Sequence, residues 1–385
     1  MAYIFLYAPF REEGETFTSN QLRSTSSAFN ISFTEPFCKV GEFSFSVPVT
    51  DKIVDFLEKG NLVSIDGEYW GIIREMDQPG DQITVYGQDL RGLLEQRITL
   101  FPDQPKDSGL QGYDAIKDVT TEALVKYFVK GNAVEPMDPN RKIMGLEIAE
   151  DLGRGVENDA YMTRFEVLSD VVTKNLELRE MGWTVKADLA RNCYVFDVVS
   201  GVDRTGAQYD NPRVVFDAEL RNVLSLEFIL SAKSERNIFY ATLSKQRREA
   251  EALTCMYPRE EGMIATGVDR REQHLNVSMQ VEAEENIYTE MRDYALKDAE
   301  RYVETRTINI QDSGRYVYGV DYNLGDIVTV QANSGIAMGI AGDARIVSIT
   351  TNWLPSGGVQ RDITLGDMRF TVVDVLNRKI KNEGE

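Results

Sequence analysis

One hairpin pattern limits the folds open to this chain more than any other feature. Leu62–Ile65 and Tyr69–Ile73 are short apolar runs, and the dipeptide Asp66-Gly67 lies between them. Asp-Gly favours the tight turn between two antiparallel strands, because both residues tolerate positive φ. Apolar side chains also alternate with serine in two upstream runs, Ile31–Phe33 and Phe43–Val47. The pattern predicts short antiparallel strands in a barrel or sandwich.

The pattern changes after residue 103. Gln104 to Gly109 has the composition of a linker, and apolar residues then recur at helical spacing from Tyr113 to Phe128. Thr163 and Glu166 have the spacing of a capping box, so we expect a second helix to begin near Thr163. Strands are expected around Trp183 and over Tyr194–Val198. These elements predict a compact α+β unit.

Strand patterns return after residue 212. They occur near Val214, from Ser225 to Leu230, over Ile238–Tyr240, and again downstream of residue 302. A charged stretch between them carries a predicted helix from Glu284 to Glu300, with Ile287, Met291, Tyr294 and Ala295 on its apolar side. A further helix is expected over Val372–Lys381.

The predicted fold class is α+β and β-rich, with two antiparallel β-barrel domains and α+β insertions. The expected domains are a first β domain (1–103), an α+β insertion (104–212), a split second β domain (213–247 plus 302–373), a smaller helical insertion (248–301), and a C-terminal tail or helix (374–385).

A weak internal repeat connects the two β domains. Gly60 to Ile65 is followed by Gly71-Ile-Ile73 and Ile83-Thr-Val85, and Gly325 to Val330 is followed by Gly339-Ile340 and Ile346 to Ile349. We expect a strand pair upstream of each stretch, the second formed by Phe228–Leu230 and Ile238–Tyr240. Three copies of a chain with two similar domains place six such domains around one axis, and paired edge strands close the ring.

Charge and composition exclude several classes of protein. Lys and Arg total 42 and Asp and Glu total 62, which gives a net charge of -20 and argues against a basic nucleic-acid-binding face. The three cysteines, Cys38, Cys193 and Cys255, are far apart and predict neither a disulfide framework nor a metal cluster. We find no basic leader before the first apolar run, and no apolar run long enough for a membrane helix.

No residue pattern predicts catalysis, so we expect no catalytic, cofactor-binding or metal-binding residues. The single histidine, His274, lies in a polar run, and Asp203-Arg-Thr205 is typical of a turn held by an aspartate side chain. Neighbouring carboxylates such as Glu147 and Asp151 are expected by chance in so acidic a chain. Aromatic side chains favour core packing over a sugar-binding platform; these are Tyr69, Trp70, Trp183 and Trp353.

Several stretches resemble the baseplate hub and tail-tip hub family of tailed phages, which includes the N-terminal module of tail-associated lysins. The stretches are Leu62–Ile73, Val85–Arg97, Gly201–Thr205, Val215–Phe216 with Leu220–Asn222, and Tyr322–Val328. None of them is a catalytic signature. Their order along the chain is the stronger signal of the resemblance.

The resemblance implies a non-enzymatic homotrimer with two tube-like β-barrels per subunit. Such a ring joins the sixfold tail tube to a threefold spike or fibre and encloses the DNA channel, without sequence-specific DNA binding. Its expected partners are tail-tube, distal-tail or baseplate proteins, the tape measure protein and a separate spike or fibre. The expected location is the virion tail, after synthesis in the bacterial cytoplasm, with no membrane insertion.

Two alternatives stay open from the sequence. One is a carbohydrate- or receptor-binding tail module, and the other is a cell-wall-degrading tail lysin. The sequence ends at Glu385, just after its last expected β domain. We therefore expect wall degradation and receptor binding to reside on a partner. The residues that line the channel or the trimer interface are not predicted.

Overall fold

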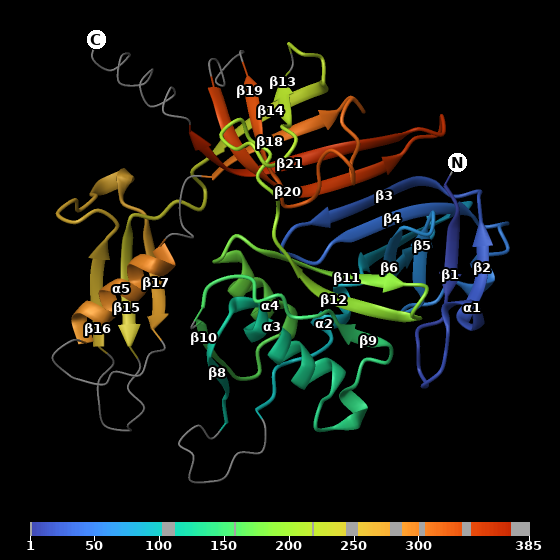
Figure 1. The fold of residues 1–385 in the computed structure, drawn as a ribbon, viewed down its shortest axis with the longest axis horizontal. Coiled ribbons are helices and arrows are strands. Elements are labelled where there is room, and N and C mark those ends of the chain that lie inside the picture. Colours follow the sequence, from blue (N-terminus) through green and yellow to red (C-terminus); the bar gives the residue numbers. More distant parts are fainter. Residues whose placement is uncertain are drawn as a thin grey trace. The chain divides into compact units, whose positions relative to one another are not determined.

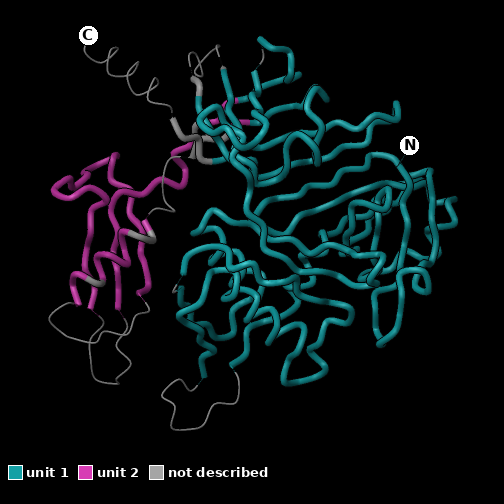
Figure 2. The backbone as a smooth tube through the Cα atoms, viewed as in Figure 1, with its two compact units in different colours: residues 1–227, 309–385 teal, residues 228–308 magenta. Residues whose placement is uncertain are grey.

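A computed structural model describes residues 2–101, 112–157, 159–217, 219–243, 253–277, 287–299, 305–332 and 340–370. Its contacts divide the chain into two compact units (Figure 2). The larger unit comprises Met1–Glu227 with Asn309–Glu385, and the smaller unit is Phe228–Ile308. The larger unit holds an α+β part and two β domains, apart from Phe228–Ser231 and Thr305–Ile308 of the second β domain, which fall within the bounds of the smaller unit. The β-rich α+β class expected from the sequence is confirmed.

The first β domain is antiparallel throughout. Its strands are β1 (Ile4–Tyr7), β2 (Gln21–Thr25), β3 (Phe29–Pro36), β4 (Glu42–Pro48), β5 (Leu62–Ile65), β6 (Tyr69–Asp77) and β7 (Gln82–Asp89), in the spatial order β3-β4-β7-β6-β5-β1-β2. Short helices α1 (Phe17–Asn20), η1 (Val54–Phe56) and α2 (Gly92–Glu95) lie between or after them. Asp66 and Gly67 both have positive φ, so the predicted hairpin turn is confirmed.

The second β domain repeats the order of five of these strands and adds one parallel pair, β13 with β19. Its strands are β13 (Val215–Asp217), β14 (Val223–Ser231), β18 (Thr305–Asp312), β19 (Ile327–Ala332), β20 (Ile340–Trp353) and β21 (Val359–Phe370). Five of them follow the order β14-β18-β21-β20-β19. The corresponding order in the first domain is β3-β4-β7-β6-β5. The strand orders therefore match one to one, and β14 takes the place of β3.

Local hydrogen bonds confirm the match. Gly60 and Gly325 both have φ of 92°. The Gly60 amide donates to the Ile73 carbonyl and the Gly325 amide to the Ile346 carbonyl, each at 2.9 Å. Ile73 and Ile346 donate in turn to the carbonyls of Asn61 (2.9 Å) and Asp326 (2.8 Å). The repeat is therefore one of backbone geometry at Gly60 and Gly325. The sequence alignment of Ile346–Ile349 with Ile83–Val85 is wrong, because Ile346 takes the place of Ile73, and Gly339 lies outside the described residues.

A β-bulge follows each of these isoleucines. The β6–β7 register shifts between Ile73 and Glu75, and the β20–β21 register shifts between Ile346 and Ser348. Arg74 thus corresponds to Val347, and Glu75 corresponds to Ser348. Bulges fix register and bend the strand that carries them, so the two domains share curvature at this point as well as strand order.

The two β domains form one continuous sheet of 13 strands, because β20 pairs with β3 (Figure 1). The N-terminal half of β20, Ile340–Arg345, pairs with β19 of its own domain. The C-terminal half, Ser348–Trp353, pairs with Ile31–Pro36 of the first domain. The β20–β3 pairing is the junction to which the later sections refer.

The α+β part lies between the two β domains in sequence. It contains β8 (Asp114–Val119), α3 (Thr121–Val129), η2 (Lys130–Val134), η3 (Pro139–Arg141), β9 (Leu146–Ile148), β10 (Asp159–Thr163), α4 (Leu168–Glu177), β11 (Gly182–Asp188) and β12 (Cys193–Val199). Its core includes Phe128, Leu176 and Trp183 and is continuous with Tyr7 and Trp70 of the first β domain. Burial of these large side chains holds the two parts together.

Two expectations for this part are wrong. Residues 114–119 form a strand instead of the start of a helix, because they pair with β10, and the helix begins only at Thr121. Thr163 ends β10 and does not cap a helix; its hydroxyl donates to Glu166 at 3.0 Å, and α4 starts at Leu168. Phe165 is half-exposed with φ of 55°, so it lies outside the apolar stripe.

The smaller unit is a three-stranded sheet covered by one helix. Its elements are β15 (Ile238–Leu243), β16 (Leu253–Pro258), η4 (Gly267–Asp269), β17 (Glu272–Val277) and α5 (Ile287–Ala299). The predicted helix is confirmed over the described residues, with Ile287, Met291 and Ala295 buried against Phe239 and Ala241. Tyr294, expected on the same side, is instead 39% exposed.

The position of Ile238–Tyr240 differs from the expectation. We assigned this strand to the second β domain, whereas it is the central strand of the small sheet. Phe239 and Ala241 alternate toward α5, and this burial binds the strand to the smaller unit. In the second β domain, β18 takes the place that we expected for it.

Some expectations lie outside the described residues. These are the linker over 104–109, the terminal helix over Val372–Lys381 and the tail that contains it. Within the described residues, no helix has both the length and the apolar character needed to cross a bilayer.

Candidate functional site

One face of the continuous sheet carries small polar side chains across both β domains. Strand alternation sends Phe33, Phe43, Phe45 and Ile349 into the cores and the intervening residues to the opposite face. We call this opposite face the polar face. It comprises Ser32, Thr34, Glu42, Ser44, Ser46, Glu75, Asp77, Thr84, Tyr86, Asn309, Ser348, Thr350, Asn352, Gln360, Asp362 and Thr364.

Side-chain hydrogen bonds cross the strands of the polar face. The hydroxyls of Ser46 and Thr84 lie 3.0 Å apart, and those of Thr34 and Thr350 lie 2.9 Å apart across the junction. Further contacts run from Asn352 to Asp362 (2.9 Å), Thr364 to Asn309 (3.2 Å) and Asn309 to Glu227 (2.9 Å). These bonds satisfy polar groups of the face within the face itself.

The charged residues among the polar-face positions are all acidic: Glu42, Glu75, Asp77 and Asp362. One arginine reaches the rim of the face, where Arg74 in the β6 bulge donates to the Gln88 side chain at 2.8 Å. Lys and Arg supply the phosphate contacts that hold proteins to nucleic acid. A face built from hydroxyl, amide and carboxylate groups therefore repels a polyanion or leaves it unbound.

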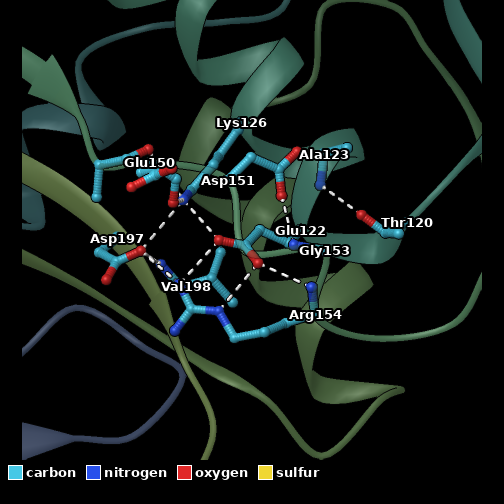
Figure 3. A network of polar contacts seen from close by, with 11 residues as sticks. Thr120, Glu122, Ala123, Lys126, Glu150, Asp151, Gly153, Arg154, Asp197 and Val198 are labelled. Atoms are coloured by element: carbon cyan, nitrogen blue, oxygen red, sulfur yellow. Dashed lines mark hydrogen bonds and ion pairs between the residues drawn. The ribbon is translucent and has the colours of Figure 1, made fainter.

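A second polar cluster is buried in the α+β part (Figure 3). Glu122 of α3 is fully buried and accepts hydrogen bonds from Lys126 Nζ (2.6 Å) and from Arg154 Nε (2.9 Å) and Nη2 (2.8 Å). Both cations also contact Asp197 of β12, at 3.2 Å and 2.6 Å. Lys126 donates further to the carbonyls of Ala149 and Glu150. Two carboxylates and two cationic side chains thus connect α3, β12 and the loop that carries Arg154.

The charges of this cluster stabilise the fold and do not favour proton transfer. Burial raises the pKa of the Glu122 carboxyl, but hydrogen bonds from Arg154 and Lys126 outweigh that effect and lower its pKa to about 2. A carboxylate that stays ionised and is fully paired cannot exchange a proton near neutral pH. The cluster therefore holds the α+β part together and lacks the split pair of acids that general acid–base catalysis needs.

The polar residues considered as possible catalytic groups make ordinary hydrogen bonds and ion pairs. The Thr205 amide donates to Asp203 Oδ1 at 2.8 Å, which confirms the expected aspartate-held turn. The imidazole of His274 lies 3.0 Å from the Thr242 hydroxyl. Glu147 pairs with Arg191, and Asp151 accepts from the Gly153 amide, so these two carboxylates do not form a pair.

The aromatic candidates pack instead of forming a platform. Trp183 is fully buried and Trp70 is 7 % exposed, so core packing is confirmed for both. Tyr69 and Trp353 pack edge to face with centroids 5.1 Å apart, and Trp353 Nε1 donates to Asp66 at 2.8 Å. These rings connect the two β domains near the junction.

A cavity of about 420 Å³ lies beside the junction. Phe37, Met181, Ile327 and Val347 supply apolar lining, and Arg345 at its edge pairs with Glu180 at 2.8 Å. Cys38, Lys39, Glu177, Asp343 and Ser348 also line the cavity, and Asp343 accepts a hydrogen bond from the Thr329 hydroxyl at 2.7 Å. Across the described parts of the chain, no three His, Cys, Asp or Glu side chains are grouped to hold a metal ion.

The polar face was not found from the sequence, although its signal was present. Ile31-Ser-Phe33 and Phe43-Ser-Phe-Ser alternate apolar residues with serine, and the second β domain has Ile349-Thr-Thr351 and Ile363-Thr-Leu365. The alternation revealed strands, but it did not show that the outward residues of both domains share one surface. The β20–β3 pairing decides that.

Comparison with known proteins agrees with the fold. The tail protein from Neisseria meningitidis MC58 is 14% identical, with a TM-score of 0.52 over 95% of this chain and 96% of that chain. The 43 kDa tail protein of prophage MuSo2 from Shewanella oneidensis is 14% identical, with a TM-score of 0.50 over 94% and 98%. No curated protein sequence matches.

A family model matches most of the chain. Residues 24–367 match the family described as Siphovirus ReqiPepy6 Gp37-like protein, a span that includes most of both β domains and both insertions. The resemblance to phage tail-tip and baseplate proteins, inferred from the order of motifs, is confirmed. The chain therefore belongs to the Siphovirus ReqiPepy6 Gp37-like family and has the fold of phage tail proteins.

Proposed function

We propose that this chain is the structural subunit of a trimeric hub ring at the tip or baseplate of a phage tail. The duplicated β domain supports the proposal. Three copies of a chain with two matching domains present six similar units to a sixfold tube, and three identical units to a spike or fibre on the other side. The role is mechanical and needs no catalytic group.

The single observation that carries the proposal is the polar face. It continues across the junction from β7, β4 and β3 to β20 and β21, and the positions given above bear acidic but no basic charge, with Arg74 at the rim bonded to Gln88. We assign it to the lumen of the ring, where DNA passes without sequence-specific binding. Cations on such a surface would retain the phosphate backbone, whereas hydroxyl and carboxylate groups let it slide.

The remaining features of the role follow from its place in the tail. The proposed partners are tail-tube and distal-tail or baseplate proteins, the tape measure protein and a separate spike or fibre. The proposed domain division follows the repeat: two tube-like β domains, with the α+β part and the smaller unit as insertions. The location is the virion tail, after synthesis in the host cytoplasm.

The oligomeric state is tested by light scattering on the purified chain and by imaging particles that contain it. We expect three times the monomer mass and threefold rings at the tail tip. A chain that stays monomeric over a wide concentration range and never enters particles contradicts the proposal.

The channel assignment is tested with a matched pair of lysine variants. Thr350→Lys places a cation on the polar face at the junction. Thr254→Lys replaces the exposed partner of another threonine pair, with Thr242, whose hydroxyls are also 2.9 Å apart. We expect Thr350→Lys to slow DNA ejection and give the ring salt-dependent affinity for duplex DNA, while Thr254→Lys does neither. Equal effects of the two variants would place the polar face elsewhere than in the lumen.

A further inference from the structure

Within the described part of the chain, two strand edges of the β domains lack the partners that their counterparts in the repeat possess. β20 pairs with β19 up to Arg345 and then, beyond the bulge, with β3. Its counterpart β6 pairs with β5 up to Ile72, and the Gly60 and Asn61 bonds end at Ile73. Beyond Ile73, the edge of β6 opposite β7 pairs with no strand in the described part of the chain.

The counterpart of β3 is also at an edge. β3 lies between β4 and β20, whereas β14 ends the strand order with β18 on one side. No strand among the described residues pairs with its other side. The strand that would occupy that place, by the repeat, corresponds to β6. The edge of β6 is therefore the counterpart of β20, and the edge of β14 is the counterpart of β3, the two strands that pair at the junction.

We propose that the Glu75–Asp77 edge of β6 pairs with β14 of a second copy of this chain, repeating the β20–β3 junction between subunits. This inference rests on the trimeric ring proposed above and identifies its contact strands. Three such contacts alternate with the three junctions within chains, so every β domain meets its neighbour in the same way. The contact is heterologous and leaves none of these edges open after closure.

Side chains at the β6 and β14 edges are exposed in the single chain, as expected for strands that become covered when subunits assemble. Glu75 and Asp77 are exposed, and Leu224 of β14 is 65% exposed, a large apolar area for a strand end. An edge strand with unpaired N–H and C=O groups and an exposed leucine is an aggregation hazard unless another strand covers it. A second copy of the chain removes that hazard at both edges.

The repeat also predicts how the two contacts differ. Ile73 corresponds to Ile346, so Glu75 takes the place of Ser348 and Asp77 the place of Thr350. β20 continues to Trp353, whereas β6 ends at Asp77. The ladder between subunits is therefore shorter than the six-residue register of the junction within the chain. A shorter ladder lets subunits exchange while each chain stays intact.

Hydrogen exchange measured by mass spectrometry tests the contact without assuming its register. Assembled rings and diluted monomers are compared at peptides covering Glu75–Asp77 and β14. We expect exchange at both to slow at least about tenfold on assembly. β3 should be protected in both states, and the exposed edge strand β2 in neither. Rings that form while both peptides exchange at the monomer rate overturn this contact and leave the trimer intact.

A matched pair of leucine variants gives a second test. Leu224→Arg alters β14, and Leu22→Arg alters β2, the strand at the other end of the sheet, where Leu22 is 36% exposed. We expect Leu224→Arg to raise the trimer dissociation constant at least about tenfold with an unchanged circular dichroism spectrum, and Leu22→Arg to have no effect. The reverse pattern would assign the contact to β2. A chain that never assembles overturns both the ring and this contact.

Discussion

The hydroxyl oxygens of Thr34 and Thr350 lie 2.9 Å apart, although 316 positions separate the two residues. Thr34 belongs to the first β domain and Thr350 to the second, and their strands form the junction. The contact shows that the outward faces of the two domains are one surface. That surface carries the proposed channel role, and the repeat of its geometry carries the proposed contact between subunits.

Removing one hydroxyl of this pair should weaken the junction modestly. We expect Thr34→Val and Thr350→Val each to lower the free energy of unfolding by about 0.5–1.5 kcal/mol, the usual net value of a hydrogen bond. The double variant should cost less than the sum, because the first change already breaks the bond. Urea unfolding of the four proteins measures the coupling. Strict additivity would show that the hydroxyls do not interact.

The matched glycines of the repeat should respond differently to alanine. Gly60 and Gly325 share a φ of 92°, so alanine strains the backbone at both by about 1–2 kcal/mol. A Cβ at Gly60 meets no atom within 4 Å, whereas one at Gly325 overlaps the Phe37 ring. We expect Gly325→Ala to lower the melting temperature clearly more than Gly60→Ala. Equal losses would mean that the Phe37 ring moves aside freely.

The buried polar cluster around Glu122 should make the free energy of unfolding depend on pH in the acid range. The pKa of Glu122 is about 2 in the folded chain, below its ordinary value of 4.5. The stabilisation is therefore complete above about pH 4.5 and declines as pH falls toward about 2, where the folded carboxylate takes up its proton. Glu122→Gln should flatten stability over this window and lower the free energy of unfolding at neutral pH by roughly 3–5 kcal/mol.

Denaturation curves at a series of pH values check this prediction. Glu157→Gln is the control, since Glu157 is exposed on the same part of the chain. A Glu122→Gln protein with the acid dependence of the parent would place the sensitive carboxylates elsewhere.

The cysteines should differ in reactivity. Burial, together with the nearby Glu177 charge, raises the pKa of the Cys38 thiol to about 12, and burial with the Glu147 charge raises that of Cys193 to about 11. Both thiols therefore stay protonated and covered at pH 8, and only thiolates react rapidly. Cys255 is partly exposed. Alkylation followed by peptide mapping should label Cys255 first and all three only in denaturant; rapid labelling of Cys38 would contradict its burial.

Local patterns were sufficient where neighbours in sequence decide the structure. The Asp66-Gly67 hairpin, the turn held by Asp203 and the helix containing Met291 need only nearby residues, and the structure contains all three. Local patterns gave the wrong element where a segment pairs with a strand that is distant in sequence. Residues 114–119 have helical spacing, yet pairing with β10 satisfies their backbone groups in extended form.

The same limit applies to Ile238–Tyr240. Its alternating pattern correctly predicts a strand, but any sheet with a free edge and an apolar cover could accept it. Burial of Phe239 and Ala241 under α5 decides in favour of the small unit. Period-two alternation defines which residues lie on each face of a strand, but it does not identify the strand that pairs with it.

The sequence by itself determined that the chain is β-rich and that its two β stretches are related, and its acidic balance argues against a basic nucleic-acid-binding face. Those properties reside in composition and short-range periodicity. Only the tertiary structure decided that β20 pairs with β3 and that the polar residues of both domains therefore share one face. It also decided that, within the described residues, one edge of β6 and one edge of β14 have no partner strand. Strand pairing is a contact between distant residues, and its register depends on the whole packed sheet.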